Sequence, residues 1–292
     1  MRSLLLALVA LCCSASASES CKSRRSPLTI DELNPSVKAA EYAVRGRLLD
    51  VAKSLEERLS NGEKLPFKKV VKCNIGNPQA LGQKPLTFVR QTLSLMINPD
   101  LRNTRGLDIT KIYPSDVLDR AEGYTKSVPS VGAYSDSQGM KLVREHVAQF
   151  ISARDGYPAS ADDIFLTDGA SSGVKALMTM LLRGPGDAVL CPVPQYPLYS
   201  ATTTMLNSTL APYFLDESAA WGVTEAELTK AVERATAKGA TPRAIVIINP
   251  GNPTGQSLPK EAIEMILAFA AREKIVVMAD EVGPLSQSIG LH

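Results

Sequence analysis

The sequence has little of what metal sites and disulfide frameworks require. It contains five cysteines and two histidines among 292 residues, and no CxxC pair occurs. These counts argue against a zinc site and against a disulfide framework. The 32 basic residues nearly balance the 30 acidic ones, so charge gives no reason to expect nucleic acid as a partner. The P-loop pattern G-x-x-x-x-G-K-[ST] is also missing.

The first twenty residues differ from the rest of the chain. Arg2 precedes an apolar run, Leu4–Cys13, and Ala15-Ser16-Ala17 fits a cleavage site between small residues. Because this run is too short to span a bilayer, it predicts a secretory signal peptide over residues 1–20. The Ser-rich, basic composition of the segment leaves an organellar transit peptide, for a mitochondrion or plastid, as the alternative. We expect no membrane segment after the leader.

Helical periodicity dominates the first half of the chain. Asn34 as a cap, Pro35 in the first turn and apolar residues at helical spacing predict one helix over Asn34–Leu59. A short strand is expected over Lys69–Asn74, followed by helices over 85–97, 115–126 and 138–153.

From Ile164 onward, short apolar runs alternate with helical stretches. We expect strands over 164–167, 188–191, 210–215, 244–248 and 275–279, with helices beginning near Ser171 and spanning 196–206, 224–238 and 259–273. Such alternation indicates βαβ units. The fold predicted is therefore α/β, a mainly parallel sheet with helices on both faces, preceded by a helical N-terminal segment.

Three polar motifs follow predicted strands, where open parallel sheets bind ligands. Thr167–Gly173 opens a helix and is either an anion site or a capped helix after a tight turn. Asn249–Gly255 is a rigid loop with two Asn-Pro units, or simply a turn. Asp280-Glu281 could hold a metal, cap a helix or pair with a ligand cation. The strand before Asp280 also looks like that of an ATPase, but the missing P-loop disfavours this rival.

Together these motifs resemble the class I/II aminotransferases, pyridoxal 5'-phosphate (PLP) enzymes of fold type I. The resemblance runs from about Asn34 to Val282 and is closest to the alanine-aminotransferase type. It rests on Val37–Gly46, Asn74–Gln79, Gly132–Gly139 and the NPGNPTGQ loop that begins at Asn249.

The resemblance implies roles for individual positions. Ala170 and Ser171 would bind the cofactor phosphate, Tyr196 would stack on the pyridine ring, Asn252 would hydrogen-bond its phenolic oxygen, and Asp280 would keep its nitrogen protonated. Tyr134 would reach the phosphate in a neighbouring subunit, which implies a homodimer, and Gly76 would lie along the substrate. From the residues alone, Tyr196 is more simply a half-buried core tyrosine.

The implied reaction moves an amino group between L-alanine and 2-oxoglutarate, an amino acid and a 2-oxo acid. The implied division is a leader (1–20), an N-terminal arm with part of a small domain (21–115), part of a PLP-binding large domain (116–282) and a divergent tail (283–292).

The sequence departs from the family pattern near its end. Gly283 stands where the family has a tyrosine, and the Schiff-base lysine, a substrate-binding arginine, two strands and a C-terminal small domain would be expected further on. Lys260 and Lys274 are the lysines beyond the Asn252 loop, and neither is expected at the site. We therefore expect the chain alone to be inactive and prone to aggregate through unpaired sheet edges. The alternative is a non-catalytic variant that acts only through PLP binding or dimerisation.

Overall fold

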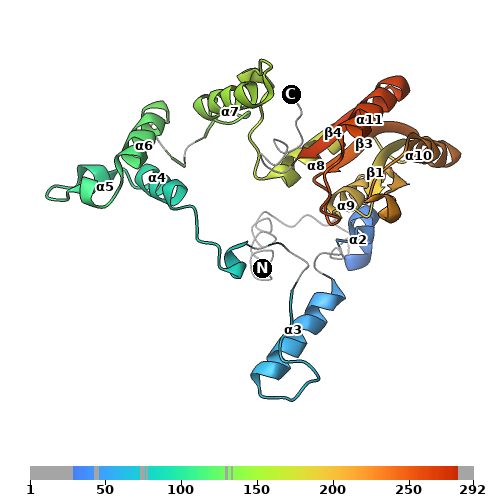
Figure 1. Ribbon diagram of the computed structural model, residues 1–292, viewed down its shortest axis with the longest axis horizontal. Helices are drawn as coiled ribbons and strands as arrows, with labels where there is room; N and C mark the ends of the chain where they lie inside the picture. The colour runs from blue at the N-terminus through green and yellow to red at the C-terminus, as the bar shows by residue number, and fades with distance from the viewer. Residues whose placement is uncertain are drawn as a thin grey trace, which may run out of the picture.

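The computed structural model describes residues 29–42, 46–72, 76, 78–128, 131–132 and 134–281. The predicted leader at 1–20 and the divergent tail at 283–292 lie outside these described residues. The structure confirms the predicted α/β fold, with a parallel sheet in the second half and helices before it (Figure 1).

The sheet has four parallel strands in the order β2-β1-β3-β4. They are β1 (Asp187–Val193), β2 (Thr209–Phe214), β3 (Thr241–Asn249) and β4 (Val276–Glu281). Four of the six strands expected from the sequence are therefore present, each within a few residues of its predicted bounds. Because all four run in the same direction, their carboxyl ends meet at one edge.

Helices cover both faces of this sheet. They are α8 (Ala170–Leu181), α9 (Leu198–Met205), α10 (Glu225–Ala237) and α11 (Lys260–Glu273). Alternate strand residues face opposite sides: Leu190 and Ile245 pack with residues of α10 and α11, whereas Val189 and Val246 pack with residues of α8 and α9. The β-branched runs of the sequence thus become a strand layer buried on both faces.

A buried carboxylate anchors the start of β1. The Asp187 side chain is 1% exposed, accepts hydrogen bonds from Arg183 Nε at 2.7 Å and from the Arg183 backbone N at 2.9 Å, and also accepts one from Arg243 Nε at 2.7 Å. These bonds, those from Arg183 first, hold the pKa of the Asp187 carboxyl well below its usual range. The pair with Arg243 ties β1 to β3 at the amino edge of the sheet, opposite the edge that carries the polar motifs.

Helices and short turns make up the N-terminal half. The α-helices are α2 (Pro35–Ala39), α3 (Arg47–Ser60), α4 (Thr87–Ile97), α5 (Asp100–Asn103), α6 (Ser115–Ser127) and α7 (Lys141–Asp155). Single 3₁₀ turns are η2 (Ile30–Glu32), η4 (Pro78–Leu81), η5 (Ile109–Lys111), η6 (Ala161–Asp163) and, within the sheet half, η7 (Glu217–Ala219). Of the helical predictions, those for 85–97, 115–126 and 138–153 are confirmed.

The single helix predicted over Asn34–Leu59 is wrong. Asn34 does cap α2, its Oδ1 accepting from Ser36 N at 2.9 Å, but α2 ends at Ala39 because Ala40 has an extended backbone (φ −71°, ψ 115°). Gly46 is extended as well and precedes α3. After Ala40 the described chain reaches the sheet half at Tyr42, which bonds Tyr196, so a tertiary contact accompanies the end of α2.

Two predicted strands are also wrong. Residues 69–72 and 164–167 form no strand, and residues 73–75 lie outside the described part of the chain. Neither segment has a described strand beside it to complete a hydrogen-bonded ladder. Leu166 N instead donates to Gln138 O at 2.8 Å, and Phe165 is two-thirds exposed.

Candidate functional site

The carboxyl edge of the sheet brings two of the predicted motifs together. In the pairing of β3 with β4, Ile248 lies opposite Asp280 and Asn249 lies opposite Glu281. The loop that carries Asn252 leaves β3 directly after this point. Asn252 and Asp280 therefore belong to neighbouring strand ends, as expected for a ligand site in an open parallel sheet.

Asp280 has a specific partner, Tyr199. The Tyr199 hydroxyl donates to Asp280 Oδ2 at 2.6 Å, and the Tyr199 side chain is 1% exposed, while Asp280 is half-buried. Burial and, second, the bond to Asp280 raise the pKa of Tyr199, so the phenol stays a donor. This bond fixes one oxygen of the carboxylate and leaves Oδ1 able to accept from a ligand.

The loop after β3 is held in shape by its own backbone. Asn249 is buried and its Oδ1 accepts from Leu258 N at 3.0 Å, while Gly251 N donates to Gln256 O at 2.8 Å. A Cβ on Gly251 would collide with the Thr254 side chain, so only glycine allows this close approach. The Asn252 side chain is exposed at the tip, where it can meet a ligand.

The amino end of α8 is open to an anion. Gly169 precedes the helix with φ +72° and provides no side chain to cap it. Thr167 Oγ1 donates to Gly169 O at 2.9 Å and Ser172 Oγ donates to Asp168 O at 3.0 Å, so these hydroxyls bond carbonyls and not the first amides of the helix. The amides of Ala170 and Ser171 point out of the first turn, where helix N-termini bind phosphate.

Tyr196 lies between β1 and α9. It packs, half-buried, against the cluster that contains Tyr199 and residues of α8. Its hydroxyl also accepts a hydrogen bond from Tyr42 Oη at 2.5 Å, with ring centroids 6.0 Å apart and planes at 81°. Tyr196 thus packs on the same cluster as Tyr199, which is the hydrogen-bond partner of Asp280.

Tyr134 and Gly76 do not join this group. The Tyr134 side chain is fully exposed, and a Cβ built on Gly76 would meet no atom within 4 Å. Two other residues near the edge, Tyr199 and Tyr42, were missed by the sequence analysis. Tyr199 follows Tyr196 at the i+3 spacing of a helix, which is a signal for a shared face. Nothing in the sequence marks Tyr42 as a site residue, apart from its place in the segment Val37–Gly46 that resembles the family.

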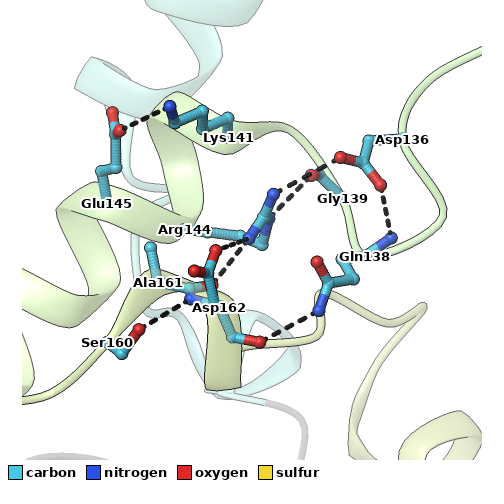
Figure 2. A network of polar contacts seen from close by, with 9 residues as sticks. All are labelled: Asp136, Gln138, Gly139, Lys141, Arg144, Glu145, Ser160, Ala161 and Asp162. Atoms are coloured by element: carbon cyan, nitrogen blue, oxygen red, sulfur yellow. Dashed lines mark hydrogen bonds and ion pairs between the residues drawn. The ribbon is translucent and has the colours of Figure 1, made fainter.

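The segment after Tyr134 is fixed to η6 and the residues before α8 by a buried arginine (Figure 2). Arg144 is 4% exposed; its Nε donates to Gly139 O at 3.0 Å and its Nη1 donates to Ala161 O at 2.7 Å. Gly139 has φ +97°, and a Cβ there would lie 2.6 Å from the Leu166 side chain. This network therefore holds residues 136–139 against 161–166, which lead directly into the α8 turn.

Among the described residues, no group of three or more His, Cys, Asp or Glu side chains is arranged to hold a metal ion. In the same part of the chain, no helix has the length and apolar character needed to cross a membrane. Two polar side chains follow the neighbouring ends of β3 and β4, the Asn252 carboxamide and the Asp280 carboxylate. The first amides of α8 are a third polar group.

Comparison with known proteins defines the class. The model of the family "Aminotransferase class I and II" matches residues 108–282, more than half of the chain. The chain belongs to this family of PLP-dependent transaminases.

The relatives narrow the class further. The chain is 47% identical over 262 residues to alanine aminotransferase 1, mitochondrial, of Arabidopsis thaliana, covering 88% of this chain and 47% of that protein. It is 48% identical over 256 residues to glutamate–glyoxylate aminotransferase 1 of the same plant, covering 87% and 51%. Two further relatives, from A. thaliana and Dictyostelium discoideum, are also named as mitochondrial alanine aminotransferases. The chain spans about half the length of these relatives, and its resemblance to the alanine-aminotransferase type is confirmed.

Among solved structures, an aminotransferase from Escherichia coli aligns with a TM-score of 0.64 at 28% identity, covering 88% of this chain and 52% of that one. The cofactor of the family is PLP, a phosphorylated pyridine. Two described groups suit parts of it: the uncapped α8 turn suits a phosphate, and the second oxygen of Asp280 suits a protonated ring nitrogen.

Proposed function

We propose that this chain forms the PLP-binding part of a transaminase that exchanges an amino group between L-alanine and 2-oxoglutarate. The observation that carries the proposal is the Tyr199–Asp280 hydrogen bond of 2.6 Å at the strand edge that also carries Asn252. The alanine-aminotransferase relatives support the choice of substrates. The glutamate–glyoxylate relative supports a related exchange as a second candidate.

Bound PLP supplies an electron-withdrawing ring that stabilises a carbanion next to the substrate amine. The residues of this chain hold it in place. The amides of Ala170 and Ser171 bind the phosphate, and the Asn252 carboxamide donates to the phenolic oxygen. Asp280 would hold the ring nitrogen in its protonated form, and Tyr199 would orient the Asp280 carboxylate through its bond to Oδ2. Tyr196 would stack on the ring. Gly76, which the structure does not bring to this group, keeps only the place along the substrate that the family resemblance implies.

The lysines after the Asn252 loop are badly placed to supply the catalytic amine. Lys260 is in the first turn of α11, with an ion pair to Glu264 at 3.7 Å, and its side chain is about half exposed. Lys274 ends α11 at the amino end of β4, roughly 20 Å from Asp280 at ~3.3 Å per residue. We propose that residues 1–292 by themselves bind the cofactor without transaminating, which keeps a PLP-binding or dimerising variant as the alternative function.

Quaternary structure and location belong to the same proposal. The full exposure of Tyr134 supports a homodimer in which this side chain reaches the phosphate of the neighbouring subunit. Three relatives with mitochondrial names support the organellar reading of residues 1–20 over the secretory one.

The test is equilibrium dialysis of the 292-residue chain with PLP. We expect Asp280→Asn to weaken binding at least about tenfold, because a charge-assisted hydrogen bond is lost, and Tyr199→Phe to weaken it by about fivefold. The matched control is Glu281→Gln, which removes the neighbouring exposed carboxylate and should leave the dissociation constant unchanged.

Equal effects of Asp280→Asn and Glu281→Gln, or no binding by the wild-type chain, would contradict the proposal.

Borohydride reduction with PLP followed by peptide mapping tests the proposal that residues 1–292 bind the cofactor without transaminating. We expect no stoichiometric labelling of Lys260 or Lys274 and no alanine-dependent consumption of 2-oxoglutarate by this chain.

A further inference from the structure

The N-terminal arm, residues 29–42, reaches the sheet half and ends at the candidate site. Figure 1 shows α2 lying beside α9, although the two helices are far apart in the sequence. The contact nearest the site joins Tyr42 to Tyr196, whose hydroxyls are 2.5 Å apart. No family role implied by the sequence falls on Tyr42.

We propose that Tyr42 is a positioning residue for the cofactor, acting through Tyr196. This inference rests on the proposed function, because Tyr196 is the side chain expected to stack on the PLP ring. Tyr42 would set the plane of that ring, so the N-terminal arm would be part of the cofactor site.

The hydroxyl end of the Tyr196 side chain needs a contact that fixes its orientation. The Tyr196 side chain is half-buried and packs against the cluster that contains Tyr199, whereas the bond that its hydroxyl makes with Tyr42 is exposed to solvent. The bond from Tyr42 holds that hydroxyl end. Because the two rings are nearly perpendicular, at 81°, Tyr42 does not stack on Tyr196 in place of a parallel aromatic ligand.

The arm is built to present Tyr42 in a fixed place. Thr29 and Glu32 form a reciprocal capping pair, with Thr29 N donating to Glu32 at 2.7 Å. Asn34 caps α2, and Lys38 Nζ donates to Asp31 O at 3.0 Å, joining η2 to α2. Ala40, with an extended backbone, then ends α2, two residues before Tyr42 meets Tyr196. A site residue whose supporting segment is held by hydrogen bonds is expected to bind better than an unsupported one.

A double-mutant cycle tests the inference. PLP dissociation constants are measured by dialysis for the wild-type chain, Tyr42→Phe, Tyr196→Phe and the double variant. Both single changes remove the same hydrogen bond and retain the rings, so we expect each to weaken binding about fivefold and the double variant to be no worse than the weaker single one. Tyr157→Phe, at a tyrosine that is 72% exposed, should match the wild type. The circular dichroism of saturated PLP should fall in Tyr42→Phe, since the ring plane is less fixed.

Unchanged affinity in Tyr42→Phe, or losses that multiply in the double variant, would overturn the inference. If the wild-type chain binds no PLP, the proposed function fails and the cofactor role of Tyr42 fails with it. In that case the same four proteins are compared by urea unfolding without PLP, which tests whether Tyr42 and Tyr196 are hydrogen-bonded. Non-additive unfolding midpoints support the Tyr42–Tyr196 bond, and additive ones refute it.

Discussion

The sheet region, residues 170–281, and the helical region, residues 29–127, fold under different constraints. In the sheet region, strands and four helices bury two apolar clusters, one on each face. In the helical region, the described core consists of Leu95, Val117 and Ala121, and α3 buries no residue at all, with Leu48 85% exposed. Helical periodicity is equally clear in both regions. Helical periodicity therefore predicts that a helix forms, but it does not predict which other element of the protein covers the apolar face of that helix.

The largest expected effect that tests this comparison comes from the middle of the sheet. Ile245 is fully buried between β1 and α11. Ile245→Ala should lower the free energy of unfolding by about 4 kcal/mol, through lost transfer energy and a cavity. The only tryptophan, Trp221, lies in the sheet region, so its fluorescence during urea unfolding reports this change.

The matched control is Leu48→Ala on α3, which should alter the same transition by less than about 0.5 kcal/mol because the side chain is already in solvent. A Leu48→Ala effect as large as that of Ile245→Ala would show that the two regions unfold as one unit and would break the comparison.

A smaller effect is expected at the amino edge of the sheet. Asp187→Asn should destabilise the sheet region by about 2 kcal/mol, since Arg183 and Arg243 lose a buried carboxylate. The folded pKa of Asp187 is depressed, so its contribution is fully present above the ordinary carboxyl pKa near ~4 and fades as pH falls further. The gap between wild type and Asp187→Asn in urea unfolding should therefore be constant from pH 8 to 5 and narrow below pH 4. A gap that widens toward acid would contradict this assignment.

The sheet was predictable because each strand carries its own signal. β1, β3 and β4 are apolar, β-branched runs bounded by polar loops, and each pairs with a described neighbour. The run at 164–167 has similar apolar character but no described strand beside it, so it makes no ladder. The helix expected over Asn34–Leu59 is interrupted after Ala39, and Tyr42 makes a contact more than 150 residues away, which no local pattern encodes.

The site was predictable to the extent that it follows the strand ends. Asn252 and Asp280 share an edge because parallel strands align their carboxyl ends, and the sequence placed both motifs directly after strands. Tyr199 and Tyr42 were not predicted, since a tyrosine in a helix and one in an arm look like ordinary surface or core residues. Their roles come from two hydrogen bonds, of 2.6 Å and 2.5 Å, that only the folded chain reveals.

Hydrogen–deuterium exchange of the 292-residue chain, with and without PLP, tests the central claim most directly. We expect PLP to slow exchange in four segments at once: the start of α8, residues 196–199, the loop 249–255 and the end of β4. Exchange in α3 to α6 should stay unchanged. Protection confined to the helical region, or no protection at the sheet edge at saturating PLP, would contradict it.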